Sequence, residues 1–184
     1  MKKIVGSEAL KTLESSFLKV FKNKDSFGNP FTEDIQTKLL LFPTDGYYLQ
    51  EDQFNVLCQI NRHIGEEEFF ISEIEGDCFS ASLSSQAYEH GHWVGNVTSM
   101  YEDYKSLPIV LENAIYSKKG NWGLMTSHEG HAILGGSKEF IVRFQGLYPK
   151  YRTSQERFFE YWKYNKSKYN SNIEWLSNFL RQFS

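Results

Sequence analysis

The side chains with the greatest chemical capability lie in the run His128-Glu129-Gly130-His131. Two nearby histidines can ligate zinc, and a zincin helix places them four residues apart with a glutamate beside the first. Here the spacing is three, Gly130 lies between Glu129 and His131, and the context is a hairpin turn rather than a helix. The run His90-Gly91-His92 would have to add ligands from elsewhere. A metal site therefore requires four histidines to converge: His90, His92, His128 and His131.

The same histidines could perform acid–base catalysis, because two histidines and a lysine can cleave RNA with one histidine as base and the other as acid. The available set is His128, His131 and Lys118, but no phosphate-cradling glycine loop or basic groove accompanies it. A metal-dependent or nuclease-like enzyme is therefore the alternative function. Neither Cys58 nor Cys78 has an activating environment, and both are interpreted as reduced core thiols. We predict no catalytic residue and no cofactor.

A structural interpretation of the cluster is a β-hairpin turn. We expect strands at 114–117 and 122–127, joined by a turn in which Gly120 takes a left-handed conformation. Residues 128–130 form the next turn, and a third strand covers 131–134 until Gly135-Gly136 ends it. Ser137 then caps a helix whose buried face carries Phe140, Ile141, Phe144 and Leu147.

The rest of the chain supplies helices and further strands around this hairpin. Apolar spacing predicts helices over 7–23, capped by Ser7, and over 51–64, with Gly65 just past the end. A short helix is expected within 33–41, strands at 69–74 and 93–98, and either a helix or a strand at 109–116. Capping-box spacings at 153–156 and 171–174 predict two tail helices separated by a polar linker, 163–170. The fold class is α+β: a mostly antiparallel sheet with flanking helices, a helical N-terminus and a helical C-terminal tail (about 152–184), in a single domain, 1–184.

Composition supports a folded protein away from membranes. Of 184 residues, 40% are hydrophobic and 16% aromatic, which is enough to form a core. No window approaches the roughly 18 apolar residues of a membrane span. Charged residues interrupt the sequence after Met1, so we expect no signal peptide and a cytoplasmic location.

Charge is distributed unevenly along the chain. The net charge is −3, yet residues 51–103 hold eleven acids against one base, Arg62. This acidic block disfavours nucleic-acid binding and would attract a basic protein partner, although a solvated acidic surface is the simpler alternative. The residues expected to bind the partner are Glu66, Glu67, Glu68, Glu73, Glu75 and Asp77.

Two segments, 47–76 (YYLQEDQFNVLCQINRHIGEEEFFISEIEG) and 112–141 (ENAIYSKKGNWGLMTSHEGHAILGGSKEFI), resemble an uncharacterised family of small bacterial proteins. Some members are similar to immunity proteins of polymorphic or contact-dependent toxin systems. The resemblance implies a cytoplasmic, non-catalytic protein that neutralises a cognate toxin, and it assigns no catalytic residue. Together with the charge pattern, it predicts a binding protein whose acidic surface covers a basic toxin domain.

Overall fold

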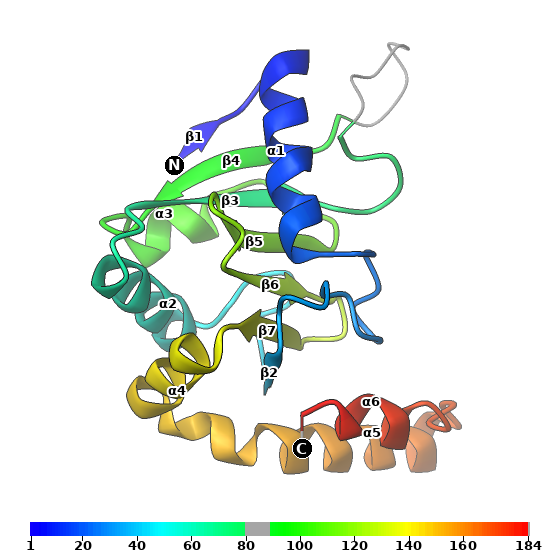
Figure 1. Ribbon diagram of the computed structural model, residues 1–184. Helices are drawn as coiled ribbons and strands as arrows, with labels where there is room; N and C mark the ends of the chain where they lie inside the picture. The colour runs from blue at the N-terminus through cyan, green and yellow to red at the C-terminus, as the bar shows by residue number, and fades with distance from the viewer. Residues whose placement is uncertain (80–88, 184) are drawn as a thin grey trace.

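A central antiparallel sheet organises the protein (Figure 1). The computed structural model describes residues 1–79 and 89–183. Within these residues the sheet has seven strands in the order β1-β4-β3-β5-β6-β7-β2, and every neighbouring pair is antiparallel. The strands are β1 (Lys2–Lys3), β2 (Thr37–Leu41), β3 (Glu68–Glu73), β4 (His92–Asn96), β5 (Asn113–Ser117), β6 (Trp122–Thr126) and β7 (Ala132–Gly136).

Helices cover both faces of this sheet, which confirms the α+β fold class with a helical N-terminus and tail. One face packs against α2 (Glu51–His63), α3 (Tyr101–Lys105) and α4 (Lys138–Leu147). The other packs against α1 (Ser7–Val20), α5 (Ser154–Tyr169) and α6 (Leu176–Arg181), and a 3-10 helix, Pro149–Thr153, joins α4 to α5.

Strand register explains why the sheet carries apolar residues on both sides. Ile115 pairs with Leu124, whereas its neighbour Ala114 pairs with Met125 on the opposite face. Because successive side chains of a strand alternate between faces, each strand contributes to both cores. Such strands have nearly continuous buried runs rather than an alternation of buried and exposed residues.

The hairpin expected between residues 114 and 137 is confirmed in its turns and its cap. Gly120 has φ +87° and Gly130 has φ +72°, the left-handed conformation that glycine adopts without steric cost. The hydroxyl of Ser137 accepts a hydrogen bond from the backbone N–H of Phe140 at 3.2 Å. Leu147, expected in the core, is instead exposed at the end of α4.

Two expectations were wrong, one about a short helix and one about the end of a strand. The segment 33–41 contains no α-helix, since residues 37–41 form β2 and pair along their whole length with β7. Gly135-Gly136 does not end β7, because both glycines lie within the strand. A Cβ on Gly135 would lie 2.7 Å from the ring of Phe31 and 2.6 Å from the side chain of Ile35, so close packing explains the glycine there.

The helix ends also differ from the sequence-based expectation. Helix α1 is preceded by Gly6 rather than Ser7 as N-cap and ends at Val20, before Asn23. Helix α5 runs through the expected linker to Tyr169, because its polar residues lie on the solvent side, and it ends where Asn170 adopts φ 55°. The hydroxyl of Thr153 donates to the carbonyl of Lys150 instead of capping α5.

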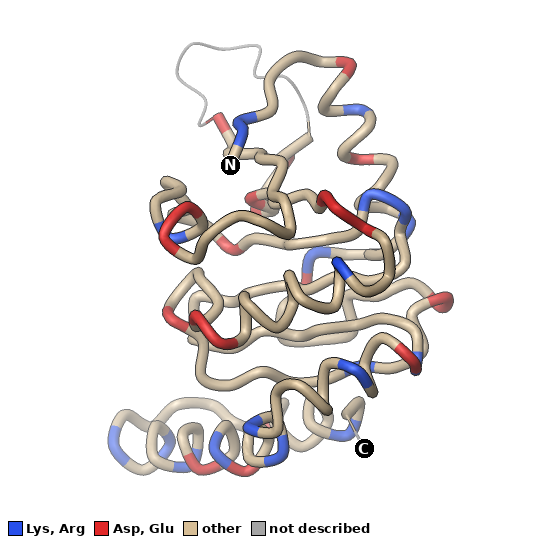
Figure 2. The backbone as a smooth tube through the Cα atoms, turned by 90° about the vertical axis from the view of Figure 1, so that its left-hand side faces the viewer, with Lys and Arg blue, Asp and Glu red and all other residues tan. Residues whose placement is uncertain are grey.

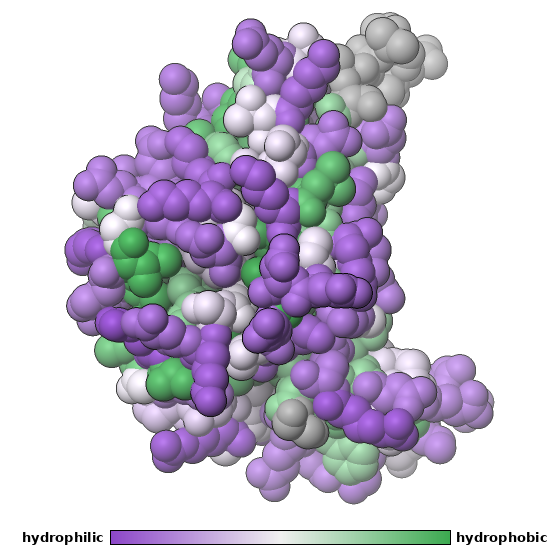
Figure 3. Space-filling model, viewed as in Figure 1, coloured by the Kyte–Doolittle hydropathy of each residue, from purple (hydrophilic) through white to green (hydrophobic). Residues whose placement is uncertain are grey.

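The outer surface is mainly hydrophilic, with small separate hydrophobic spots on the face drawn in Figure 3. Among the described residues, none of the helices has both the length and the apolar character that crossing a membrane requires.

Candidate functional site

The exposed histidine of the 128–131 turn is held by a carboxylate. His128 Nδ1 lies 2.7 Å from Glu112 Oε1, and its Nε2 lies 3.5 Å from Glu129 Oε1. In a catalytic triad, a carboxylate accepts a hydrogen bond from histidine Nδ1–H, and the hydroxyl of the nucleophile donates a hydrogen bond to Nε2. The hydroxyls of Ser26 and Ser127 donate to Glu112 itself rather than to His128. This arrangement fixes the turn and does not activate either serine.

His131 lies inside the protein and packs in the hydrophobic core. Its side chain is fully buried, and its Nε2–H donates to the carbonyl of Ser26 at 2.8 Å. The rings of Phe27, Phe158 and Phe179 surround it. Burial lowers the pKa of His131 to about 4, so the imidazole is neutral at physiological pH. Its Nδ1 atom is buried without a hydrogen-bond partner among the described residues.

His92 belongs to a separate buried relay. Its Nε2–H donates to the carbonyl of Cys78 at 2.8 Å, so its Nδ1 accepts from Ser72 Oγ at 2.9 Å. Tyr116 in turn donates to Ser72 Oγ at 2.9 Å. Burial lowers the pKa of His92, which keeps the ring neutral as this relay requires.

The four histidines do not form a metal site. His92 lies in β4 and His131 directly precedes β7, and the strand order places three strands between these two. At a strand spacing of about 4.8 Å, this separates the two rings by roughly 19 Å. Across residues 1–79 and 89–183, no group of three or more metal-binding side chains is suitably placed. His90 and His128 therefore complete no tetrahedral set.

The nuclease-like set is not assembled either. Lys118 follows the far end of β5 and pairs with Glu68 at 2.7 Å, whereas His128 is bound to Glu112 at the near end of that strand. The five residues of β5 separate these two strand ends by roughly 17 Å. His131 is excluded by its burial.

Two of the six acids expected to bind a partner are buried, which corrects that expectation. Glu66 is 4% exposed and accepts hydrogen bonds from Ser117 Oγ at 2.6 Å and Asn121 Nδ2 at 2.7 Å. Glu73 is 0% exposed and accepts from the backbone N–H groups of Gly91 and Val110 at 2.7 and 2.9 Å. Both carboxylates hold the sheet to neighbouring loops and are inaccessible to a partner.

The other four expected acids are exposed but lie apart. Glu67 and Glu68 are at the start of β3, whereas Glu75 and Asp77 follow its end. The length of this strand separates the two pairs by roughly 20 Å. Glu68 is also neutralised by Lys118. The structure thus divides the acidic block into distinct surfaces.

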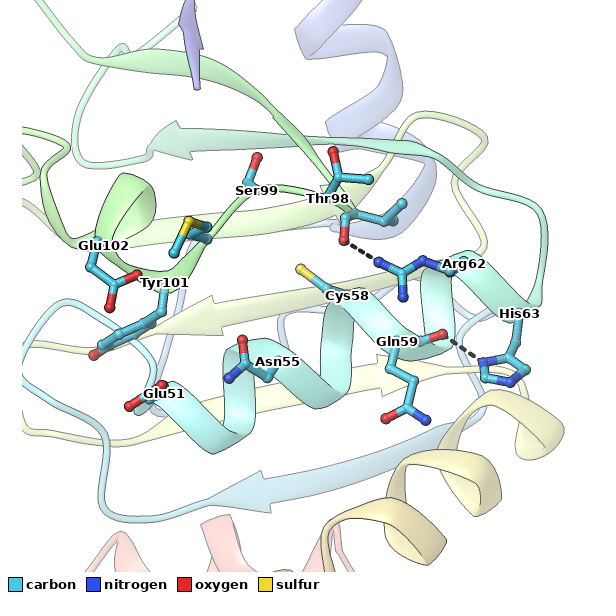
Figure 4. Close-up of a pocket in the computed structure, with 12 residues that line it drawn as sticks. Glu51, Asn55, Cys58, Gln59, Arg62, His63, Thr98, Ser99, Tyr101 and Glu102 are labelled. Carbon is cyan, nitrogen blue, oxygen red and sulfur yellow. Dashed lines mark hydrogen bonds between the residues drawn. The ribbon is translucent and has the colours of Figure 1, made fainter.

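A surface groove lies between α2 and the segment 97–102 (Figure 4). Its volume is about 540 Å³. Glu51, Glu102 and Tyr101 lie together at one end, which we call the acidic end, while Arg62 and His63 lie at the other. The remaining lining residues are Asn55, Cys58, Gln59, Val97, Thr98, Ser99 and Met100.

The pKa of Tyr101 reflects the negative charge at the acidic end of the groove. Burial raises its pKa to about 12, with further contributions from the negative charges of Asp45, Glu51, Asp52 and Glu102. Its hydroxyl donates to the carbonyl of Leu49 at 2.9 Å, which fixes the ring against the start of α2. Four carboxylates from three segments therefore act on one phenol.

Only part of this negative charge is neutralised within the protein. Lys105 pairs with Asp45 and Lys150 with Asp52, each at 2.6 Å. Glu51 and Glu102 have no ion-pair partner among the described residues. Each lies in the first turn of a helix, Glu51 in α2 and Glu102 in α3, where the N-terminal partial charge stabilises a carboxylate. Figure 2 shows the acidic positions at the starts of these two helices.

An exposed apolar side chain adjoins these acids. Met100 is 66% exposed and lines the groove directly before Tyr101. Its backbone N–H donates to Asp103 Oδ2 at 3.0 Å, which anchors the first turn of α3. Met100 and Tyr101 were not predicted from the sequence. The two Glu-Asp pairs, 51–52 and 102–103, could have indicated that their segments share an acidic surface.

The cysteines do not provide a nucleophile, because both are buried and free. Cys58 lies beneath the groove, and burial raises the pKa of its thiol to about 12. Burial likewise raises the pKa of Cys78. A protonated, buried thiol is unreactive, as the sequence led us to expect.

No protein-family model matches this chain, and comparisons with curated proteins and with solved structures find no significant similarity.

Proposed function

We propose that this chain is a non-catalytic binding protein that receives a basic segment of a partner at the acidic end of the groove. The observation that carries the proposal is the pair Glu51 and Glu102, two unneutralised carboxylates beside the exposed side chain of Met100. A lysine or arginine can pair with these carboxylates while an apolar neighbour contacts the methionine. Such a combination of charge and flexible apolar surface suits protein recognition.

The biological role that we propose is that of an immunity protein acting in the cytoplasm. Many nucleic-acid-cleaving toxins need a basic active surface, and an acidic inhibitor is complementary to it. Two free, buried thiols agree with a reducing compartment. The resemblance of segments 47–76 and 112–141 to a family of small bacterial proteins, some of which are similar to immunity proteins, supports the same role.

The role is tested by co-expression with each of the proteins encoded next to this chain's gene, of which the immunity role requires one to be toxic. We expect the wild-type chain to restore growth and the double variant Glu51→Gln/Glu102→Gln to lose protection. The matched control, Glu67→Gln/Glu75→Gln, removes the same charge from exposed positions outside the groove and should still protect. Absence of a toxic neighbour, or a toxic neighbour that is unaffected by the wild-type chain, would refute the immunity role.

Binding at the groove is tested separately with a labelled peptide that alternates lysine with leucine. Its affinity should fall in the Glu51→Gln/Glu102→Gln variant, but not in the control, and should weaken as salt screens the charges. Equal binding by both variants would show that the groove is not the site.

A further inference from the structure

The outer face of α5 carries a stripe of basic and aromatic side chains. Arg157, Tyr161, Tyr164 and Lys168 follow one another at intervals of four, three and four residues, which places all four on one helical face. The face that contains Phe158 and Trp162 points into the core. We call the four outward residues the α5 stripe; it extends about 16 Å along the helix.

Aromatic exposure is concentrated on this helix. Of the ten large hydrophobic side chains that are exposed in the described residues, four belong to α5: Phe159, Tyr161, Tyr164 and Tyr169. Tyr164 is 54% exposed and Tyr161 39%, yet Tyr161 is held in place by the rings of Phe42 and Trp162. Large rings presented in fixed positions to solvent are typical anchors of protein interfaces.

The positive charge of the stripe has no acidic partner in the described part of the chain. Neither Arg157, Lys166 nor Lys168 forms an ion pair there, whereas Lys163 is paired with Glu160 at 3.1 Å. Lys168 Nζ lies 2.8 Å from the hydroxyl of Tyr164. Figure 2 shows basic positions recurring along α5 at the base of the molecule.

Ring geometry separates two classes of anionic ligand. Single-stranded nucleic acid needs free aromatic faces on which bases stack. Here the ring of Tyr161 packs against Phe42 and Trp162, and lysine amines lie 5.3 and 5.2 Å from the ring centres of Phe159 and Tyr169. These three rings are therefore already engaged, and Tyr164 alone does not form a stacking platform. The cations of the stripe, which form no ion pair among the described residues, and the exposed ring of Tyr164 remain available, and they suit carboxylates and apolar side chains.

We propose that the α5 stripe is a second docking surface, which binds an acidic protein segment through Arg157 and Lys168 with Tyr161 and Tyr164 as anchors. Its charge is opposite to that of the acidic end of the groove, so the two surfaces select different ligands. The proposal is independent of the immunity role.

The experiment titrates the full chain into a fluorescein-labelled amphipathic peptide of glutamate, leucine and alanine, about 12 residues long to match the stripe. Fluorescence anisotropy should show binding that weakens with salt. The Arg157→Gln/Lys168→Gln variant should raise the Kd about tenfold, as expected for the loss of two exposed charge pairs. Tyr164→Ala should also weaken binding, because its exposed ring is removed without disturbing the core.

The matched control is Lys11→Gln/Lys138→Gln, which removes the same charge from exposed positions on α1 and α4 and should leave the Kd unchanged. Oligothymidine and phosphatidylserine vesicles are titrated in parallel. Absence of peptide binding, equal loss in the control, or stripe-dependent binding of the oligonucleotide or vesicles in preference to the peptide would each overturn the proposal.

Discussion

Replacing His131 by glutamine should remove a large part of the acid sensitivity of this fold. Burial lowers the pKa of His131 to about 4, whereas an unfolded histidine titrates near 6.5. Between these values the unfolded chain binds a proton that the folded protein excludes. The free energy of unfolding therefore decreases as the pH falls through this window, by about 1.4 kcal/mol per pH unit and about 3 kcal/mol in total.

Glutamine at position 131 can still donate to the Ser26 carbonyl but does not titrate. Urea unfolding at a series of pH values gives the free energy of unfolding of both proteins by linear extrapolation. At pH 7 the wild type should be the more stable, and by pH 4 the difference should have shifted toward the variant by about 3 kcal/mol. His92, whose pKa is also lowered, adds acid sensitivity to both proteins and cancels in the comparison.

His63→Gln provides the control, because it makes the same substitution at a ring that is exposed on α2 instead of buried. Its free energy of unfolding should follow the wild type across the same pH range. If the curves of the wild type and His131→Gln ran parallel from pH 7 to 4, a neutral buried imidazole at position 131 would be ruled out.

Three further substitutions test the packing that positions the groove and the sheet. Glu66→Ala leaves the buried hydroxyl of Ser117 without its acceptor and should cost about 2 kcal/mol in urea unfolding; an unchanged midpoint would contradict a structural carboxylate. Gly135→Ala places a methyl group 2.7 Å from the Phe31 ring and should cost about 1–3 kcal/mol, so a neutral or stabilised variant would argue against the close packing. Ser137→Ala removes the N-cap of α4 and should lower stability by about 1 kcal/mol, and a loss below 0.3 kcal/mol would show that the cap is dispensable.

Local signals in the sequence predicted the features that depend on neighbours in the chain. Gly120 forms its turn and Ser137 its cap through contacts within a few residues, and α2 follows from its apolar spacing. Strand β2 was missed because its pairing with β7 depends on residues far along the chain. A short apolar run is ambiguous between a helix and a buried strand until that partner is known.

The candidate site was predicted less well, because charge in the sequence does not determine exposure. Glu66 and Glu67 are adjacent, yet one is buried against a hairpin and the other is exposed. The nearly uninterrupted apolar run of β3 could have indicated that Glu73 is buried, since strands covered on both faces have that pattern. The acidic end of the groove depends on two helix starts meeting in space, which no local pattern encodes.

The strand order has a consequence for how the protein folds. Both outer strands, β1 and β2, come from the first 41 residues, whereas the strands between them come from residues 68–136. Thr37 must pair with Gly136, roughly a hundred residues later, and such long-range pairing slows folding because a long loop must close first. During synthesis, the first strands remain unpaired until their neighbours have been made, and the central strands provide the template that recruits them.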